Sequence, residues 1–167
     1  MNIDADGSVA ATGLLMVVAV SVLAVLGAHG RSTSTDPEIG TWRLDPQKSS
    51  FYPGPAHRSQ VRTVTQVGDT QFLKNETVTA EGFRLHISYE ARFDGRPYPV
   101  AGTPMGDAVA LRRINERTVE ATIFKNGVVV ATDVRVVSGD GTTLTVTQRG
   151  IGPGGQRIEN VLVYRRQ

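Results

Sequence analysis

The chain contains few of the side chains from which metal sites and nucleophilic catalysts are usually built. It has no cysteine among its 167 residues, and its three histidines are His29, His57 and His86. A protein metal site needs several convergent Cys, His or carboxylate ligands, and these histidines stand far apart in the sequence. We therefore expect no bound metal and no other cofactor, and the lack of cysteine excludes disulfides and thiolate chemistry.

The acidic residues also lack the spacing of catalytic pairs or triads. Asp69, Asp94 and Asp140 each stand beside a glycine in segments typical of turns. In such turns an aspartate side chain accepts hydrogen bonds from nearby backbone N–H groups, which explains its presence without catalysis. The sequence identifies no catalytic residue.

The elements that would position any site are strands. Beyond residue 40, apolar and polar residues alternate almost throughout, most clearly in FRLHISYEARF at residues 83–93, and this period is typical of strands with one buried face. Pairs such as Asn126-Gly127 and Asp140-Gly141 separate the runs and supply the positive φ angles of tight hairpins. We expect strands at residues 40–45, 59–67, 71–80, 83–93, 97–101, 107–114, 117–125, 128–138, 143–149 and 157–165.

Short antiparallel strands in this number must hide their edges, and a closed meander does so most economically. The sequence predicts an all-β fold, an antiparallel up-and-down β-barrel of 8–10 strands over residues 40–167. A sandwich of two sheets is the alternative, but hairpins between sequential strands favour the barrel.

The N-terminal part is different in character. Residues 8–28 are uncharged and mostly apolar, long enough to span a bilayer as a helix, and they end in small residues of the kind that precede signal-peptide cleavage. Three interpretations stay open: a cleaved signal peptide, a retained membrane anchor, or a buried core helix. Residues 29–39 are polar and predict a flexible linker. We expect export, with the barrel periplasmic or secreted, or anchored to a membrane through residues 8–28.

The charge balance argues against one class of partner. The net charge is +2, from 18 basic and 16 acidic residues. Binding to a nucleic-acid backbone needs many clustered cations. We therefore expect no nucleic-acid partner, and membrane contact only through residues 8–28. The oligomeric state is left open.

Two segments resemble the calycins, the group that contains the lipocalins and the fatty-acid-binding proteins. GTWRL at residues 40–44 resembles the Gly-x-Trp signature of lipocalins, and NVLVYRRQ at residues 160–167 resembles the last strand of fatty-acid-binding proteins. In lipocalins the tryptophan closes one end of the barrel beneath an arginine. The resemblance implies a structural role for Trp42, covered by Arg165 or Arg166.

Longer blocks within residues 40–167 resemble a group of exported bacterial barrel proteins of uncharacterised function, which implies the fold and the compartment but no activity. These blocks are GTWRLDPQKSSFYPGP, FDGRPYPVAG, VALRRINERTVEATIFKNG, VVSGDGTTLTVTQRG and VYRRQ. The Arg-x-Tyr pair with which fatty-acid-binding proteins hold a carboxylate is not repeated, because Leu162 stands in place of the arginine.

The expected function is a lipocalin-like barrel that binds a small apolar ligand in its lumen. Tyr89, Arg113, Gln148 and Tyr164 are the candidate ligand-binding residues, since they share the inward parity of their strands or match the last-strand tyrosine. The inward face of residues 83–93 is apolar apart from the Tyr89 hydroxyl, and Leu162 stands where the related carriers have an arginine, so we expect a neutral or weakly polar ligand. Arg113 is the one cation expected at an inward position, and it would reverse this expectation if it reached the lumen.

Two other functions stay open. The first is a structural or protein-interaction barrel whose interior is filled by side chains, and the second is an enzyme with a site at the barrel mouth. A continuous cavity above about 300 Å³ would favour the binding barrel over the filled one.

Overall fold

The computed structural model describes residues 36–167, which form a closed barrel of ten antiparallel strands. Each strand pairs with its neighbours in sequence, and β10 closes the barrel against β1. The predicted all-β antiparallel barrel is confirmed, with the upper number of strands. The strands are β1 (Gly40–Leu44), β2 (Ser59–Val67), β3 (Thr70–Val78), β4 (Arg84–Arg92), β5 (Tyr98–Ala101), β6 (Ala108–Asn115), β7 (Thr118–Lys125), β8 (Val128–Val137), β9 (Thr143–Ile151) and β10 (Arg157–Arg166).

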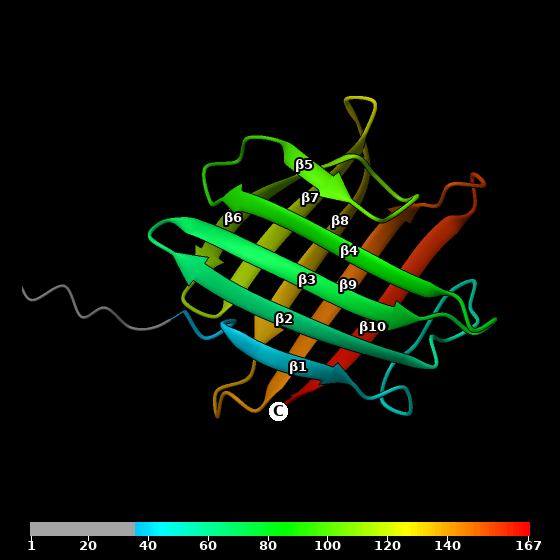
Figure 1. Ribbon diagram of the computed structural model, residues 1–167, viewed down its shortest axis with the longest axis horizontal. Helices are drawn as coiled ribbons and strands as arrows, with labels where there is room; N and C mark the ends of the chain where they lie inside the picture. Colours follow the sequence, from blue (N-terminus) through cyan, green and yellow to red (C-terminus); the bar gives the residue numbers. More distant parts are fainter. Residues whose placement is uncertain (1–35) are drawn as a thin grey trace, which may run out of the picture. The chain divides into compact units, whose positions relative to one another are not determined.

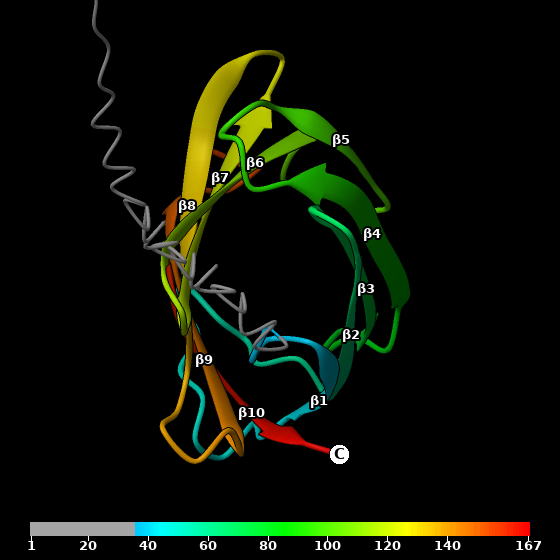
Figure 2. The same cartoon turned by 90° about the vertical axis from the view of Figure 1, so that its left-hand side faces the viewer.

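The two walls of the barrel cross at a steep angle, with β1–β4 in front of β7–β10 (Figure 1). A view turned by a quarter shows β2–β4 opposite β7–β9, with β5 and β6 joining the two walls on one side (Figure 2). Within the part of the chain that the structure describes, no helix is long and apolar enough to cross a membrane. The predicted apolar helix at residues 8–28 and most of the predicted linker lie outside the described residues.

One end of the barrel is closed around Trp42, whose side chain is fully buried. The indole Nε1 donates a hydrogen bond of 2.8 Å to the carbonyl oxygen of Glu38. The guanidinium of Arg166 lies over the indole, 4.1 Å from the ring centroid, where the ring face attracts a cation. It is thus Arg166, and not Arg165, that covers the tryptophan in the way the resemblance implies.

Arg166 also holds the chain that enters the first strand. It donates hydrogen bonds of 2.6 and 2.7 Å to the carbonyl oxygens of Pro37 and Ile39, and one of 2.7 Å to that of Gly141. Gly40 must be glycine here, because its φ is +141° and a Cβ would lie 2.5 Å from the Arg166 guanidinium. These contacts fix where the chain enters the barrel.

The barrel begins earlier than the alternating pattern of the sequence indicates. Residues 36–39, which were expected to belong to the linker, contribute to the closed end. Glu38 is only 2% exposed and forms hydrogen bonds inside the barrel, and Asp36 accepts a hydrogen bond from the Arg113 guanidinium. A polar segment without an alternating pattern looks like a linker in sequence, although its charged side chains are bound by residues distant in the chain.

Replacing Trp42 with alanine should lower the free energy of unfolding by about 3–5 kcal/mol, because it removes a fully buried indole and leaves a cavity beneath Arg166. Urea unfolding measures this change. The matched control is Phe83→Ala, since Phe83 is 69% exposed and should lose less than about 0.5 kcal/mol. Similar losses in the two variants would refute the structural role of Trp42.

Candidate functional site: a polar-walled lumen

The lumen contains a cavity of about 260 Å³ lined by residues from every strand except β1. One part of its wall is apolar and comes mainly from β4 to β7 and the loop between β5 and β6. The other part is polar and comes from β2, β3 and β8 to β10. The apolar wall includes Leu85, Ile87, Val100, Met105, Val109 and Ile123, and the polar wall includes Gln60, Arg62, Asn75, Asp133, Arg135, Gln148 and Asn160.

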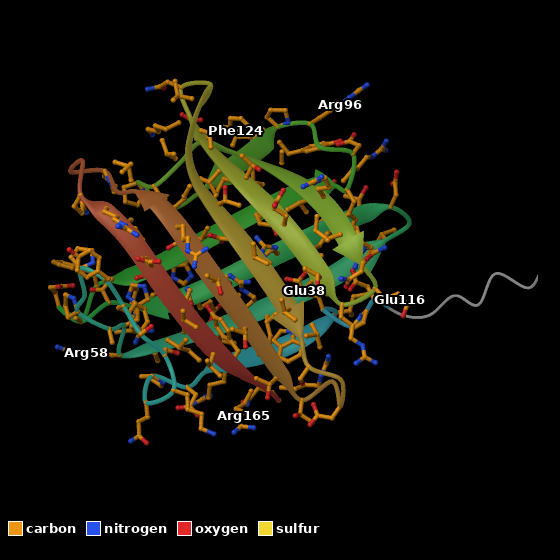
Figure 3. All side chains as sticks on the ribbon, turned by 180° about the vertical axis from the view of Figure 1, so that it is seen from behind. Glu38, Arg58, Arg96, Glu116, Phe124 and Arg165 are labelled. Carbon is orange, nitrogen blue, oxygen red and sulfur yellow. The ribbon has the colours of Figure 1, made fainter. Side chains whose placement is uncertain are left out.

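The floor of the lumen is a closed ring of four buried side chains. Arg135 donates a hydrogen bond of 2.6 Å to the Tyr89 hydroxyl, which donates one of 3.0 Å to the Gln71 side-chain oxygen. The Gln71 amide donates one of 3.2 Å to Glu38, whose other carboxylate oxygen lies 3.5 Å from Arg135. Figure 3 shows Glu38 among the barrel strands, in contrast to the peripheral Arg58, Arg96 and Glu116.

The ring keeps the Arg135 charge in place. Burial alone would lower the pKa of Arg135, but the Tyr89 hydroxyl, Glu38 and Asp133 outweigh burial, so that the pKa is raised. Burial likewise raises the pKa of Tyr89, which therefore stays neutral and serves as both donor and acceptor. Arg135 is thus a charged side chain that is balanced by Glu38 and hydrogen-bonded to Tyr89.

Arg62 is the second arginine of the lumen, and it has different surroundings. Its side chain is buried, donates one hydrogen bond of 3.1 Å to the Asn75 side-chain oxygen and lies 5.2 Å from the centroid of the Tyr164 ring. Among residues 36–167 it forms no ion pair, and its buried NH1 group has no hydrogen-bond partner. This guanidinium lines the cavity.

Asp133 lines the same cavity, and one of its buried carboxylate oxygens has no hydrogen-bond partner within the described part of the chain. Burial raises the pKa of Asp133, while Arg135 and Arg62 partly oppose the shift. On the neighbouring strand Gln148 stands opposite Asp133 and accepts a hydrogen bond of 3.0 Å from Asn160. Three residues of the polar wall thus have a buried polar atom without a hydrogen-bond partner: Arg62, Asp133 and Arg135.

The predicted ligand-binding residues are distributed over both ends of the barrel. Tyr89 and Gln148 line the cavity. Tyr164 is fully buried in the core cluster around Trp42 and does not line the cavity, and its hydroxyl donates a hydrogen bond to Gln60. Arg113 lies at the closed end, where it binds Asp36 and its guanidinium is 4.2 Å from the Phe93 ring centroid, so it does not contribute to the cavity wall. Their roles in ligand binding stay predictions.

The expectation that Arg113 is the one inward cation is wrong, because Arg62 and Arg135 are both buried in the lumen. On β8 the inward positions 133 and 135 hold the charged Asp133 and Arg135, while the outward positions hold Val134 and Val136, which are 36% and 41% exposed. The usual arrangement of apolar residues inside and polar residues outside is thus reversed here. The inward position of Asp133 and Arg135 could have been found from the strand period, since the two residues share their face with the buried Ala131 and Val137.

The histidines do not converge. The described residues contain no group of three or more His, Asp or Glu side chains able to hold a metal ion. His86 is exposed on β4. His57 lies at the edge of the cavity, 5.4 Å from the Phe51 ring centroid, and burial lowers its pKa although Glu81 opposes the shift.

Comparison with solved structures shows a distant likeness in fold. No protein-family model and no curated protein matches the chain. Among solved structures, the chain is similar to zebrafish ileal bile acid-binding protein in complex with cholic acid, with 11% identity and a TM-score of 0.48 over 78% of this chain and 99% of that one. At this level of similarity, function has to be inferred from the side chains of the lumen itself.

Replacing Glu38 with glutamine should lower the free energy of unfolding by about 3–5 kcal/mol, because it removes the carboxylate that is paired with the buried Arg135 guanidinium. Urea unfolding measures the change. The control is Glu120→Gln, which breaks the exposed pair with Arg112 and should lose less than about 1 kcal/mol.

A double variant tests whether the loss comes from the ion pair. Glu38→Gln combined with Arg135→Met should lose less stability than the sum of the two single variants, because no charge is left unpaired. Additive losses would show that the two side chains are not coupled.

Proposed function

We propose that the barrel binds a small amphipathic molecule in its lumen, with an apolar body against β4 to β7 and an acidic head at Arg62. The observation that carries this proposal is the buried Arg62 guanidinium, which lines the cavity and forms no ion pair with any described residue. A buried cation without an anion is unfavourable, and a ligand carboxylate would supply that anion.

The two arginines of the lumen differ in what they can offer a ligand. Arg135 is already paired with Glu38 and bonded to Tyr89, so recruiting it would require breaking the ring. Arg62 has only a neutral amide and an aromatic ring as partners. An acidic ligand therefore replaces the neutral one expected when the lumen was thought to lack a free cation.

The cavity limits the size of the ligand. At about 260 Å³ it falls short of the volume of about 300 Å³ expected of a binding barrel, so the volume alone does not favour binding and the proposal depends on Arg62. A water molecule occupies roughly 30 Å³ in the liquid, so the cavity has the volume of roughly nine water molecules or a similar number of carbon and oxygen atoms with their hydrogens. An eight-carbon acid such as octanoic acid is of this size, and its chain would contact the apolar wall.

Purified full-length protein should bind octanoate more tightly than octanol. In Arg62→Met the affinity for octanoate should fall by roughly 10- to 100-fold, the effect of losing one hydrogen bond to a charged group, while octanol binding changes little. Isothermal titration calorimetry measures both. The matched control is Arg113→Met, which removes an arginine outside the cavity and should leave both affinities unchanged.

Other results would point elsewhere. Equal binding of acid and alcohol by the unmodified protein would refute the acidic head group. Loss of octanoate binding in Arg113→Met alone would move the cationic site to the closed end. If neither compound binds, the barrel is a filled, structural one.

The same proposal places the barrel outside the cytoplasm, on the strength of the uncharged apolar run at residues 8–28. Expressed in a bacterial host, the protein should be recovered outside the cytoplasm. N-terminal sequencing should find either a start near residue 29 or the intact chain in the membrane fraction. Intact protein in the soluble cytoplasmic fraction would refute export.

A further inference from the structure

Asp133 is the feature of the cavity that the proposed function leaves unexplained. It is 7% exposed, lines the same cavity as Arg62, and has a buried carboxyl oxygen without a partner among residues 36–167. A ligand carboxylate bound by Arg62 would therefore share the cavity with a second carboxyl group.

The charges buried in the lumen restrict how this space can be occupied. The buried ionisable acids and bases of the described chain are Glu38, Arg62, Asp133 and Arg135, and with both acids ionised their charges sum to zero. A ligand carboxylate would add one uncompensated negative charge, which is strongly unfavourable in a low-dielectric interior. Two carboxyl groups in one site avoid this cost when they share a single proton.

We propose that the lumen accepts an acidic ligand only while Asp133 carries a proton, and that the Asp133 carboxyl group donates this proton in a hydrogen bond to the ligand carboxylate. The proposal rests on the acidic ligand inferred above. The proton comes from the solvent, and no covalent bond of the ligand forms or breaks. With Asp133 neutral, the positive charge of Arg62 is free to balance the ligand, because Glu38 balances Arg135.

The other groups around Asp133 do not supply this proton. Arg135 lies two residues along β8 and Arg62 faces Asp133 from β2, and both raise its acidity, although burial outweighs them and raises the pKa of Asp133. Glu38 is held by Arg135 at the floor. Gln148, opposite on β9, does not titrate.

Two kinds of titratable side chain remain nearby. Burial raises the pKa of both Tyr89 and Tyr164, which keeps them neutral below pH 10. Burial lowers the pKa of His57, which keeps that side chain neutral above pH 7. These neighbours therefore keep their charge between pH 7 and 9.5, which leaves Asp133 as the group on this wall whose proton can couple to ligand binding.

The sign of the pH dependence follows from proton linkage. Once Asp133 is ionised in the free protein, the complex holds one proton more than its separated components, so octanoate affinity falls as the pH rises, approaching tenfold per pH unit. Octanoate itself stays ionised above about pH 6 and does not contribute. Octanol adds no charge, so its affinity should not change over the same range.

The experiment is calorimetric titration of the full-length protein with octanoate and with octanol at several pH values from 7 to 9.5. Repeating it in two buffers of different ionisation enthalpy gives the number of protons taken up. Asp133→Asn, which keeps a donor but cannot ionise, should bind octanoate with a pH-independent affinity and at least tenfold more tightly than the unmodified protein at pH 9.5. His57→Gln is the control and should retain the pH dependence.

Each other outcome overturns the proposal. Octanoate binding that is independent of pH in the unmodified protein, or a pH dependence that survives in Asp133→Asn or disappears in His57→Gln, refutes the role of Asp133 but leaves the acidic-ligand function standing. If neither compound binds at any pH, both inferences fall together. Should Asp133→Asn fail to fold, the pH dependence and the proton count of the unmodified protein decide the question.

Discussion

The pair of Glu38 and Arg135 imposes the main constraint on this barrel. A guanidinium that is 3% exposed needs an anion, and no outward-facing residue can supply one. Glu38 reaches Arg135 from the segment before β1, and its own carbonyl oxygen accepts the Trp42 indole N–H. The closed end and the floor of the lumen therefore form one assembly, which is complete only when residues 36–39 are in place.

The same pair determines which arginine remains free. Glu38, Gln71, Tyr89 and Arg135 form a ring of hydrogen bonds closed by the Glu38–Arg135 ion pair, so the charge of the floor is balanced. Arg62, which lines the same cavity, has no ion-pair partner within the described residues. Because only one of the two cations is free to bind an anion, the proposed ligand would be oriented in the cavity, with its acidic head at the polar wall and its apolar body at the opposite wall.

The strands and turns of the barrel could be predicted from the sequence, but the side chains that line the lumen could not. Hairpin pairs such as Asn126-Gly127 and the alternation of residues 83–93 predict the meander, because turn geometry and strand period are local properties. The inward Arg62 and Arg135 were missed because adjacent valines lie on the outer face of the same strands, so hydrophobicity alone assigns the wrong side. Glu38 was missed because its partners, Gln71 and Arg135, lie far along the chain and only the closed barrel brings them together.

The polar wall also bears on the choice between a binding barrel and a filled one. Folding alone gives no reason to bury Arg62 and Asp133, since apolar side chains of similar volume would often close a lumen with equal or greater stability. The ring around Arg135 has a structural role, because it holds Glu38 and the segment before β1 at the closed end of the barrel. Arg62 and Asp133 line the cavity without an ion pair to any described residue, whereas Arg135, whose Nε also lacks a hydrogen bond, is paired with Glu38. Buried polar groups without partners are rare in folded proteins and are normally satisfied by a bound molecule or by water. The unfavourable burial of these two side chains is therefore better explained by what enters the cavity than by the fold that surrounds it.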